Sequence, residues 1–227
     1  MQPDPDKPFT LYFVRHGITE PNFKGMRCGG DNDVPMMDIG CDQAYLLAKQ
    51  IQKMDLGIGV IVAGSLIRTR QTAHIISGVL GDVPIELEPL INERRLGEWN
   101  SRTIAETEEM LAKRVTPPGG ESEEQFSARI GKALEGLRRF HDRRPLLVSS
   151  KGVGRVMHTL LEPPPLRCLD VRILVIPVVL NLVGIAAETD HEHVDRAGCA
   201  VGRRRDDVIH IKMTDALYDP PHVLATL

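Results

Sequence analysis

The chain has 227 residues and a formal net charge of −3, with a pI near 6.2. This length suits one large domain with a substantial core and room for a small cap. The charge balance gives no basic excess, which argues against nucleic acid or an anionic membrane as a partner. The four cysteines form no CxxC pair, so the sequence predicts neither a zinc site nor a disulfide scaffold, and a reducing cytoplasm is the expected location.

Two segments bear on targeting and membranes. Residues 1–8 are polar and proline-rich, which predicts a loose tail rather than a signal peptide. Residues 173–187 read ILVIPVVLNLVGIAA, and these fifteen residues fall short of the roughly 20 that a membrane-spanning helix needs. Pro177, Asn181 and Gly184 interrupt the run, so we expect two short buried strands with a turn between them.

Short apolar runs alternate with helical patterns along the chain. Besides the pair just described, the predicted strands are at 10–14, 58–63, 84–87, 146–149 and near 208–213. The predicted helices are at 43–54, 66–80, 104–113, 123–141 and 153–161. Ser65 is the expected N-cap of the second helix. This alternation predicts a three-layer α/β/α fold with a mostly parallel sheet, in one domain over residues 1–227 with a small helical cap over about 94–122.

The sharpest chemical signal is VRHGITEPN, directly after the first strand. Arg15 and His16 stand at the carboxyl end of that strand, where open α/β sheets bind ligands, and Gly17 lets the backbone approach a bound group. Arginine presents a planar fork to phosphate oxygens, and a neutral imidazole nitrogen can attack phosphorus. Thr19 and Asn22 add short hydrogen-bonding side chains. Taken alone, Arg15 and His16 could equally be an ordinary arginine beside a structural histidine.

Two further stretches favour the chemical interpretation. GSLIRTRQTA follows the second strand and places Arg68 early in a helix, where the helix dipole also favours an anion. INERRLGEWNSR follows the third strand and places Glu93 at the equivalent point. A carboxylic acid there could protonate a leaving alkoxide and later take a proton from water. Arg94 and Arg95 come next and could recognise a second anionic group on the substrate.

VRHGITEPN, GSLIRTRQTA, INERRLGEWNSRT and PPGGES, in this order, resemble the histidine phosphatase superfamily, in its phosphoglycerate mutase-like branch. The resemblance runs from about residue 10 to residue 161. It implies a parallel sheet with flanking helices, a cap inserted after the third strand, and an enzyme that uses no metal or other cofactor. The short cap is more similar to the phosphatases than to the mutases.

The resemblance also implies a role for each matching residue. His16 would be the nucleophile that accepts the phosphoryl group, and Glu93 would be the proton donor. Arg15 and Arg68 would bind the phosphoryl oxygens. Asn22 stands where the family contacts phosphate.

One turn departs from the family pattern. The family's fourth strand ends in a Ser-His-Gly turn whose histidine is the second imidazole of the phosphate pocket, and this chain reads Ser149-Ser150-Lys151-Gly152 there. In one interpretation, Ser150 and Lys151 bind phosphate in place of that histidine, and activity survives. In a second, nothing replaces it and the enzyme is slow. In a third, the chain is a phosphate-ester-binding or regulatory protein without useful turnover.

The sequence therefore predicts a cytoplasmic, metal-independent phosphomonoester hydrolase that acts on a small phosphorylated metabolite through a phosphohistidine. A phosphoglycerate mutase-type phosphotransferase and a catalytically impaired binding or regulatory protein are the alternatives. The expected partners are the phosphorylated metabolite or inorganic phosphate, and a homodimer is left open. The substrate is not named, because a phosphoryl pocket is generic. DHEH at residues 190–193 has no second ligand cluster, so no metal is predicted.

Overall fold

The computed structural model describes residues 9–161 and 171–175. All of them belong to one unit, which spans residues 1–178. The tail at 1–8, the strand near 208–213 and the DHEH stretch lie outside the described residues, so the single domain over the whole chain stays a prediction. Among the described residues, no helix has both the length and the apolar composition that crossing a bilayer requires.

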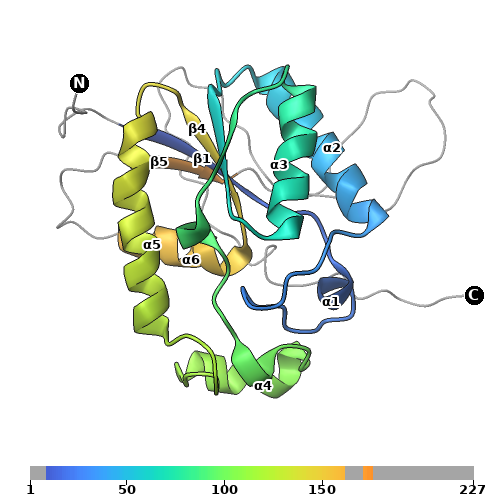
Figure 1. The fold of residues 1–227 in the computed structure, drawn as a ribbon, viewed down its shortest axis with the longest axis vertical. Coiled ribbons are helices and arrows are strands. Elements are labelled where there is room, and N and C mark those ends of the chain that lie inside the picture. Colours follow the sequence, from blue (N-terminus) through green and yellow to red (C-terminus); the bar gives the residue numbers. More distant parts are fainter. Residues whose placement is uncertain (1–8, 162–170, 176–227) are drawn as a thin grey trace, which may run out of the picture. The chain divides into compact units, whose positions relative to one another are not determined.

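The described elements follow the predicted alternation of strands and helices (Figure 1). The strands are β1 (Phe9–Arg15), β2 (Val60–Ala63), β3 (Ile85–Leu87), β4 (Pro145–Ser149) and β5 (Val171–Val175). The α-helices are α1 (Glu20–Phe23), α2 (Asp38–Met54), α3 (Ile67–Val79), α4 (Ile104–Ala112), α5 (Glu123–Leu137) and α6 (Lys151–Leu161). Three single-turn 3-10 helices are η1 (Pro89–Ile91), η2 (Gly97–Trp99) and η3 (Arg138–Phe140).

The five strands form one parallel sheet in the order β3-β2-β4-β1-β5. β1 and β4 are neighbours, and their register ends with Arg15 opposite Ser149. The predicted α/β class with a mostly parallel sheet is confirmed. β5 also confirms the first of the two strands expected within residues 173–187, although it begins two residues earlier. The second lies outside the described residues.

Alternate residues of the central strands face two different layers of core. Leu11 and Phe13 of β1 lie in the core layer beneath α5 and α6. Tyr12 and Val14 lie in the other layer, beneath α2 and α3. Figure 1 shows these two helix pairs on opposite sides of the sheet. Both faces of the sheet are thus covered, which explains why the strands are apolar throughout rather than alternating.

Several helix boundaries differ from the predicted ones. α2 begins at Asp38 rather than residue 43, because Gly40, which interrupts the apolar pattern, is needed inside the first turn: a Cβ there would collide with the carbonyl oxygen of Ile18. α5 ends at Leu137 and continues as η3 instead of reaching residue 141. α6 begins at Lys151, two residues before the predicted start. The short helix α1 was not predicted.

The prediction that Ser65 caps α3 is wrong. The N-cap residue is Leu66, which has no capping side chain. Ser65 is occupied elsewhere, since its backbone N–H and its hydroxyl both bind the side-chain amide of Asn92 at 2.8 Å. The first free N–H group of the helix, at Ile67, instead donates to the Asp33 carboxylate at 2.7 Å. Asp33, a loop residue distant in sequence, therefore caps α3 in place of an N-cap side chain.

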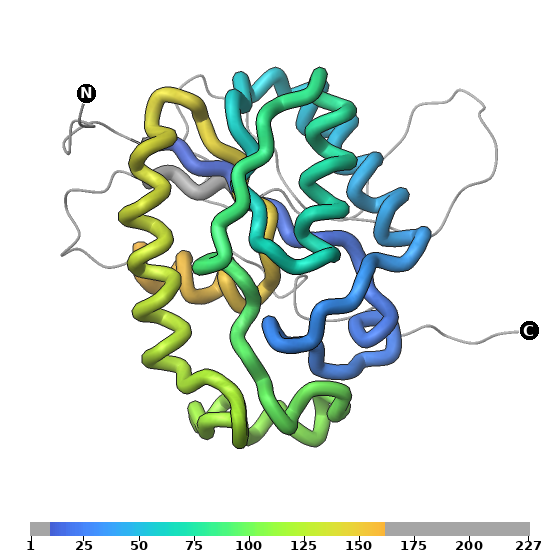
Figure 2. Tube along the Cα trace, viewed as in Figure 1, coloured from blue at the N-terminus to red at the C-terminus, as the bar shows by residue number. Residues whose placement is uncertain are grey.

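α4 lies in the segment predicted as the cap, between β3 and α5 (Figure 1). It begins with a capping box, in which Thr103 and Glu106 satisfy each other's backbone N–H groups. The loop after β1 runs beside this segment (Figure 2): Arg27 N donates to Arg102 O, and Ile104 N donates to Gly25 O. The cap is thus joined directly to the loop that leaves the first strand.

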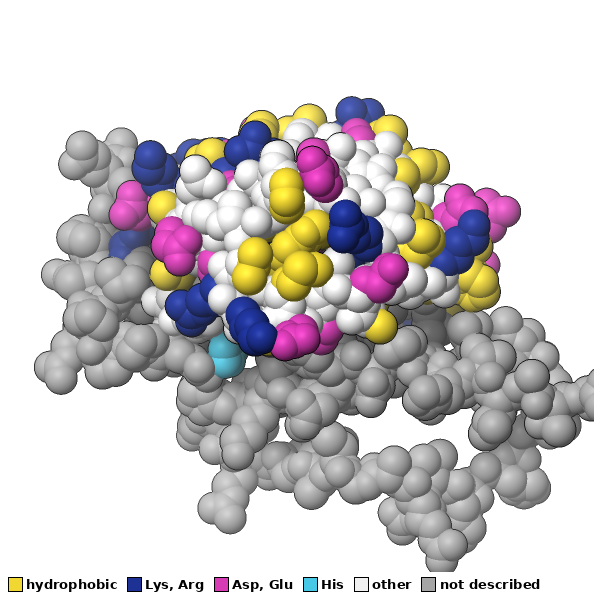
Figure 3. All heavy atoms as spheres, turned by 90° about the horizontal axis from the view of Figure 1, so that it is seen from below, with side chains coloured by type: hydrophobic (Ala, Val, Ile, Leu, Met, Phe, Trp, Pro, Cys, Tyr) yellow, Lys and Arg dark blue, Asp and Glu magenta, His cyan; other side chains and the backbone are white. Residues whose placement is uncertain are grey.

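The outer face of the cap carries charges of both signs around a small apolar area (Figure 3). Ile104 and Val115 are the large apolar side chains of this segment that are exposed. Because neither sign of charge dominates, this face has no strong electrostatic preference for one class of partner.

Candidate active site

The candidate site lies at the carboxyl ends of β1 and β4. The chain leaves β1 toward α2 on one face of the sheet and leaves β4 toward α6 on the other. Two adjacent parallel strands whose following helices lie on opposite faces open a crevice between them, which is where such folds bind ligands. His16 and Ser150 are the first residues past the two strands, and His16 N donates to Ser149 O at 2.9 Å.

The His16 ring is held in one tautomer. It is 7% exposed, and its Nδ1 lies 2.8 Å from the carbonyl oxygen of Gly17. Since a carbonyl only accepts, Nδ1 must carry the proton, which leaves the Nε2 lone pair free to act as a nucleophile. Gly17 permits this close packing, because a Cβ there would collide with the carbonyl oxygen of Gly40. Its N–H group donates to the Thr72 hydroxyl at 3.3 Å and so is not aimed at a ligand.

The surroundings keep His16 neutral. Burial lowers its pKa well below the ordinary value of 6.5, and the positive charges of Arg15 and Arg68 lower it further. The hydrogen bond to Gly17 opposes these effects without overcoming them. A neutral imidazole is the form that can attack phosphorus.

This lowered pKa predicts a pH dependence of stability. In the unfolded chain His16 takes up a proton below its ordinary pKa of 6.5, whereas in the folded protein it stays neutral to much lower pH. Since the unfolded state then binds more protons, the free energy of unfolding must fall as the pH falls below this value, by up to about 1.4 kcal/mol per pH unit. We expect urea unfolding between about pH 7.5 and about pH 5.5 to show a smaller loss in His16→Gln than in the wild type. Equal losses would contradict the neutral buried histidine.

Arg68, the second residue of α3, is a fully buried cation beside His16. Its Nη1 donates to Asn32 O at 2.9 Å and its Nη2 donates to Gly29 O at 3.1 Å. Its Nε is buried without a hydrogen-bond partner, and no carboxylate among the described residues pairs with it. A buried guanidinium held only by carbonyl groups favours an anion that can neutralise it.

Arg15 contributes a second guanidinium, and no described residue pairs with it. Burial lowers the pKa of Arg15, the nearby Glu93 charge raises it and Arg68 lowers it again, so the three side chains share one electrostatic environment. Asn22 lies in the short helix α1, which follows β1, and its Oδ1 accepts the Thr19 hydroxyl at 3.0 Å. That bond leaves the Asn22 amide NH2 as the group available to a ligand. Thr19 itself is fully buried, and its hydroxyl orients Asn22 instead of reaching into the crevice.

Glu93 reaches from the loop after β3 to the start of α6. One carboxylate oxygen accepts the N–H of Arg94 at 2.8 Å, and the other accepts the N–H of Gly152 at 3.1 Å. A Cβ at Gly152 would collide with the Glu93 carboxylate, so a larger residue there would displace this side chain. Glu93 is therefore brought beside the turn that follows β4, as the sequence predicted for strands ending at the same edge of a sheet.

The turn after β4 presents Ser150 and Lys151. Ser150 is 2% exposed, and its hydroxyl is buried without a hydrogen-bond partner. The Lys151 side chain is more exposed, and its pKa is lowered by partial burial and next by the positive charge of Arg15. A buried hydroxyl without a partner costs free energy unless a ligand or water satisfies it. The Ser150 hydroxyl can therefore donate a hydrogen bond to an oxygen of a bound anion.

Arg94 and Arg95 differ in their exposure to solvent. Arg94 is buried, and its guanidinium donates to Glu121 O at 2.7 Å and pairs with Glu123 at 2.9 Å, while Arg155 pairs with the other oxygen of Glu123 at 2.6 Å. Arg94 thus ties the loop after β3 to the start of α5. Arg95 is exposed at the edge of a pocket and remains the better placed of the two to meet a substrate.

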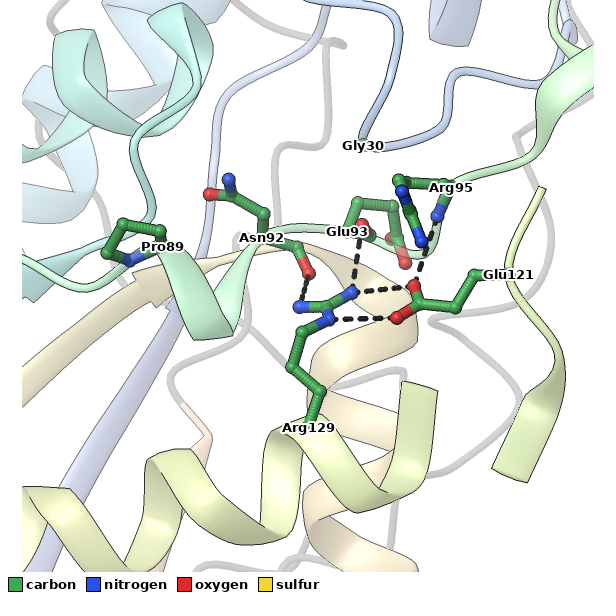
Figure 4. A pocket seen from close by; sticks show the side chains of 7 residues that line it. All are labelled: Gly30, Pro89, Asn92, Glu93, Arg95, Glu121 and Arg129. Carbon is green, nitrogen blue, oxygen red and sulfur yellow. Dashed lines mark hydrogen bonds and ion pairs between the residues drawn. The ribbon is translucent and has the colours of Figure 1, made fainter. Parts of the chain in front are cut away.

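That pocket, of about 220 Å³, lies beside the loop that carries Glu93 (Figure 4). Its lining residues are Gly30, Pro89, Asn92, Glu93, Arg95, Glu121 and Arg129. Asn92 and Arg129 have no role among the residues predicted from the sequence. Glu121 belongs to the PPGGES stretch, which carries part of the family resemblance and no predicted role of its own. No local pattern marks Arg129, which is one of several arginines in the second half of the chain.

The chain matches the family model of the histidine phosphatase superfamily (branch 1) over residues 11–176. It is 37% identical to the probable phosphoglycerate mutase GpmB of Photorhabdus laumondii over 166 residues, which cover 68% of this chain and 75% of that protein. It is 33% identical to the probable phosphoglycerate mutase GpmB of Yersinia pestis, with the same coverage.

Two solved structures show the same fold. The mycobacterial glucosyl-3-phosphoglycerate phosphatase complexed with VO3 has a TM-score of 0.57 and 25% identity, over 69% of this chain and 82% of that one. A putative alpha-ribazole-5'-P phosphatase from Escherichia coli has a TM-score of 0.56 and 26% identity, over 68% of this chain and 80% of that one. The resemblance found in the sequence motifs is thus confirmed, for a segment that includes every candidate site residue.

Proposed function

The chain belongs to branch 1 of the histidine phosphatase superfamily, and from this premise we propose that it is a metal-independent phosphomonoester hydrolase. One observation supports the proposal above the others. Arg68 Nε and Ser150 Oγ, both buried beside the His16 nucleophile, lack partners within the described protein. Such groups fit the oxygens of a phosphoryl group. The substrate would be a small phosphorylated metabolite, and the proposal includes a cytoplasmic location.

The reaction would proceed in two displacements. First, His16 Nε2 attacks phosphorus, the bond from phosphorus to the ester oxygen breaks, and Glu93 donates its proton to the departing alkoxide. Arg15 and Arg68 bind the phosphoryl oxygens, whose charge they balance throughout. Then water attacks the phosphohistidine, Glu93 takes the proton of that water, and the phosphorus–nitrogen bond breaks. Inorganic phosphate leaves, and His16 and Glu93 return to their starting protonation states.

A phosphotransferase of the phosphoglycerate mutase type is the second candidate, because the curated relatives are named as probable mutases. It differs in its last step, in which a substrate hydroxyl and not water accepts the phosphoryl group. A binding protein without turnover is the third, because Ser150 occupies the position expected for the second histidine of the family.

The test is phosphate release from a panel of phosphomonoesters in the presence of a metal chelator. We expect release from several esters, and only slow interconversion of 2- and 3-phosphoglycerate. Interconversion that outpaces phosphate release would favour the mutase. Binding of phosphate in calorimetry, without release from any ester, would favour the binding protein and overturn the proposed hydrolase.

Lys151 provides a prediction about the missing histidine. If its ammonium group helps to bind the phosphoryl oxygens, Lys151→Ala should lower kcat/KM by about 10-fold to 100-fold and weaken phosphate inhibition. Lys132→Ala, at an exposed position of α5, is the matched control and should leave both unchanged. Unchanged kinetics in Lys151→Ala would remove this residue from the phosphate pocket and leave Ser150 as the remaining replacement.

A further inference from the structure

Arg129 of α5 contacts the loop that carries Glu93 from behind (Figure 4). The buried hydroxyl of Ser149 also donates to Ile91 O in this loop. Arg129 Nη1 donates to Leu90 O at 2.6 Å and to Asn92 O at 3.0 Å. Its Nη2 donates to Glu93 O at 3.4 Å. A single guanidinium thus contacts three carbonyl groups in four consecutive residues, and the last of them belongs to the proposed proton donor.

Glu121 fixes the orientation of that guanidinium. Its two carboxylate oxygens accept from Arg129 Nε at 2.9 Å and from Nη2 at 2.8 Å, which is a two-bond, fork-to-fork contact. Glu121 is 3% exposed, and the Arg129 charge and hydrogen bond hold its pKa below the ordinary range despite burial. The Arg129 side chain is 20% exposed, so the buried member of the pair is Glu121. Loss of Arg129 would leave the Glu121 carboxylate as a buried charge without its partner, which favours an intact pair.

The front of the same loop is where the chemistry would occur. The Glu93 side chain is directed to the N–H of Gly152, at the turn that follows β4, while its main-chain carbonyl faces Arg129. Neither contact alone fixes the carboxyl group, since the side chain has rotatable bonds and a loop can shift. A general acid must lie within hydrogen-bond reach of the leaving oxygen, and a displacement of about 1 Å can cost about 100-fold in rate.

We propose that Arg129, oriented by Glu121, is a positioning residue that sets where the Glu93 carboxyl delivers its proton. The inference rests on the proposed hydrolase function and deepens it. In this proposal Arg129 acts through the main chain of the acid, although its side chain also lines the pocket beside that loop. Its effect should therefore depend on how much the leaving group needs that proton.

The experiment compares two esters in the wild type and in Arg129→Gln. An alkyl phosphate such as glycerol phosphate has a leaving oxygen that must be protonated, whereas p-nitrophenolate leaves readily without a proton. We compare kcat/KM, which reports the transfer of the phosphoryl group to His16 and excludes the later attack of water that both esters share. We expect Arg129→Gln to lower kcat/KM for the alkyl ester by about 10-fold to 100-fold and kcat/KM for p-nitrophenyl phosphate by less than about 3-fold. Glu93→Gln should show the same selectivity with a larger loss. Arg129→Lys should recover part of the alkyl rate.

Arg143→Gln is the matched control. Arg143 also clamps a backbone carbonyl, that of Gly59 at 2.9 Å, but at the amino ends of β2 and β4, far along the sheet from the crevice. It should keep the wild-type ratio of the two rates. If Arg129→Gln does not fold, the ratio is measured in Arg129→Lys. A wild-type ratio in a folded Arg129 variant overturns the positioning role and leaves the hydrolase intact. Failure of the wild type on both esters overturns the hydrolase, and the inference with it.

Discussion

Replacing His16 with alanine should lower phosphate release by about 10⁴-fold or more, which is the largest effect that we expect from any single substitution. The reason is that this residue forms the bond to phosphorus. Arg15, Arg68 and Glu93 can bind and protonate an ester, but no other described residue at the crevice combines a free lone pair with a lowered pKa. Phosphate release from a good substrate, measured at a pH near 8, tests this directly.

His74→Ala is the control for His16→Ala, because His74 lies exposed on α3 and takes no part in the crevice. It should keep the wild-type rate. A brief reaction quenched with base should leave an acid-labile phosphoryl group on the wild type and on His74→Ala, but none on His16→Ala. A labelled His16→Ala protein would show that another residue is the nucleophile.

The proximity of the main site residues could be predicted from the sequence. Parallel strands end at the same edge of a sheet, so residues in the segments that follow three apolar runs are expected to lie near one another. His16, Arg68 and Glu93 are therefore expected to share one crevice, and the effects of Glu93 and Arg68 on the pKa of Arg15, and of Arg15 and Arg68 on the pKa of His16, agree with this. The class of fold followed from the same alternation of runs and helices.

The partners of polar side chains could not be predicted in this way. Thr19 and Arg94 both have side chains suited to a phosphate site, yet Thr19 is bonded to Asn22, and Arg94 is paired with Glu123 29 residues away. Arg129 contacts Glu93 across 36 residues. Such contacts depend on how α5 packs against the loop after β3, and periodicity in a sequence carries no information on that packing.

Arg68 should contribute in two ways: its guanidinium binds the phosphoryl group, and its positive charge lowers the pKa of His16. Binding depends on the shape of the guanidinium, whereas its effect on the pKa of His16 depends on the charge alone. Arg68→Ala removes a phosphate-binding fork, so we expect kcat/KM to fall by about 10²-fold to 10³-fold. It also removes one of the two positive charges that lower the pKa of His16. The pKa should rise toward its ordinary value, and the acid limb of the profile of kcat/KM against pH should move to higher pH.

Arg68→Lys distinguishes the two contributions. A lysine keeps the positive charge but cannot reproduce the planar fork, since an ammonium group is a compact point charge. It should therefore lose rate, as Arg68→Ala does, while its acid limb stays near that of the wild type. Arg70→Ala, at an exposed position two residues along α3, should change neither quantity.

Stability must be measured alongside, because Arg68 also holds the loop after β1. Its loss removes one donor from each of the carbonyl groups of Gly29 and Asn32, which keep the Asn32 N–H and the Cys28 thiol, respectively, as their remaining donors. A net hydrogen bond is worth about 0.5–1.5 kcal/mol, so we expect a loss of stability of about that size for each bond. Urea unfolding gives the range of pH in which each variant is folded, and kinetics are compared only there. An acid limb that moves equally in Arg68→Ala and Arg68→Lys would mean that the shape of the pocket, and not the charge of Arg68, sets the protonation of His16. An acid limb that moves in neither would leave burial and Arg15 as the causes of the lowered pKa, with Arg68 confined to binding the phosphoryl group.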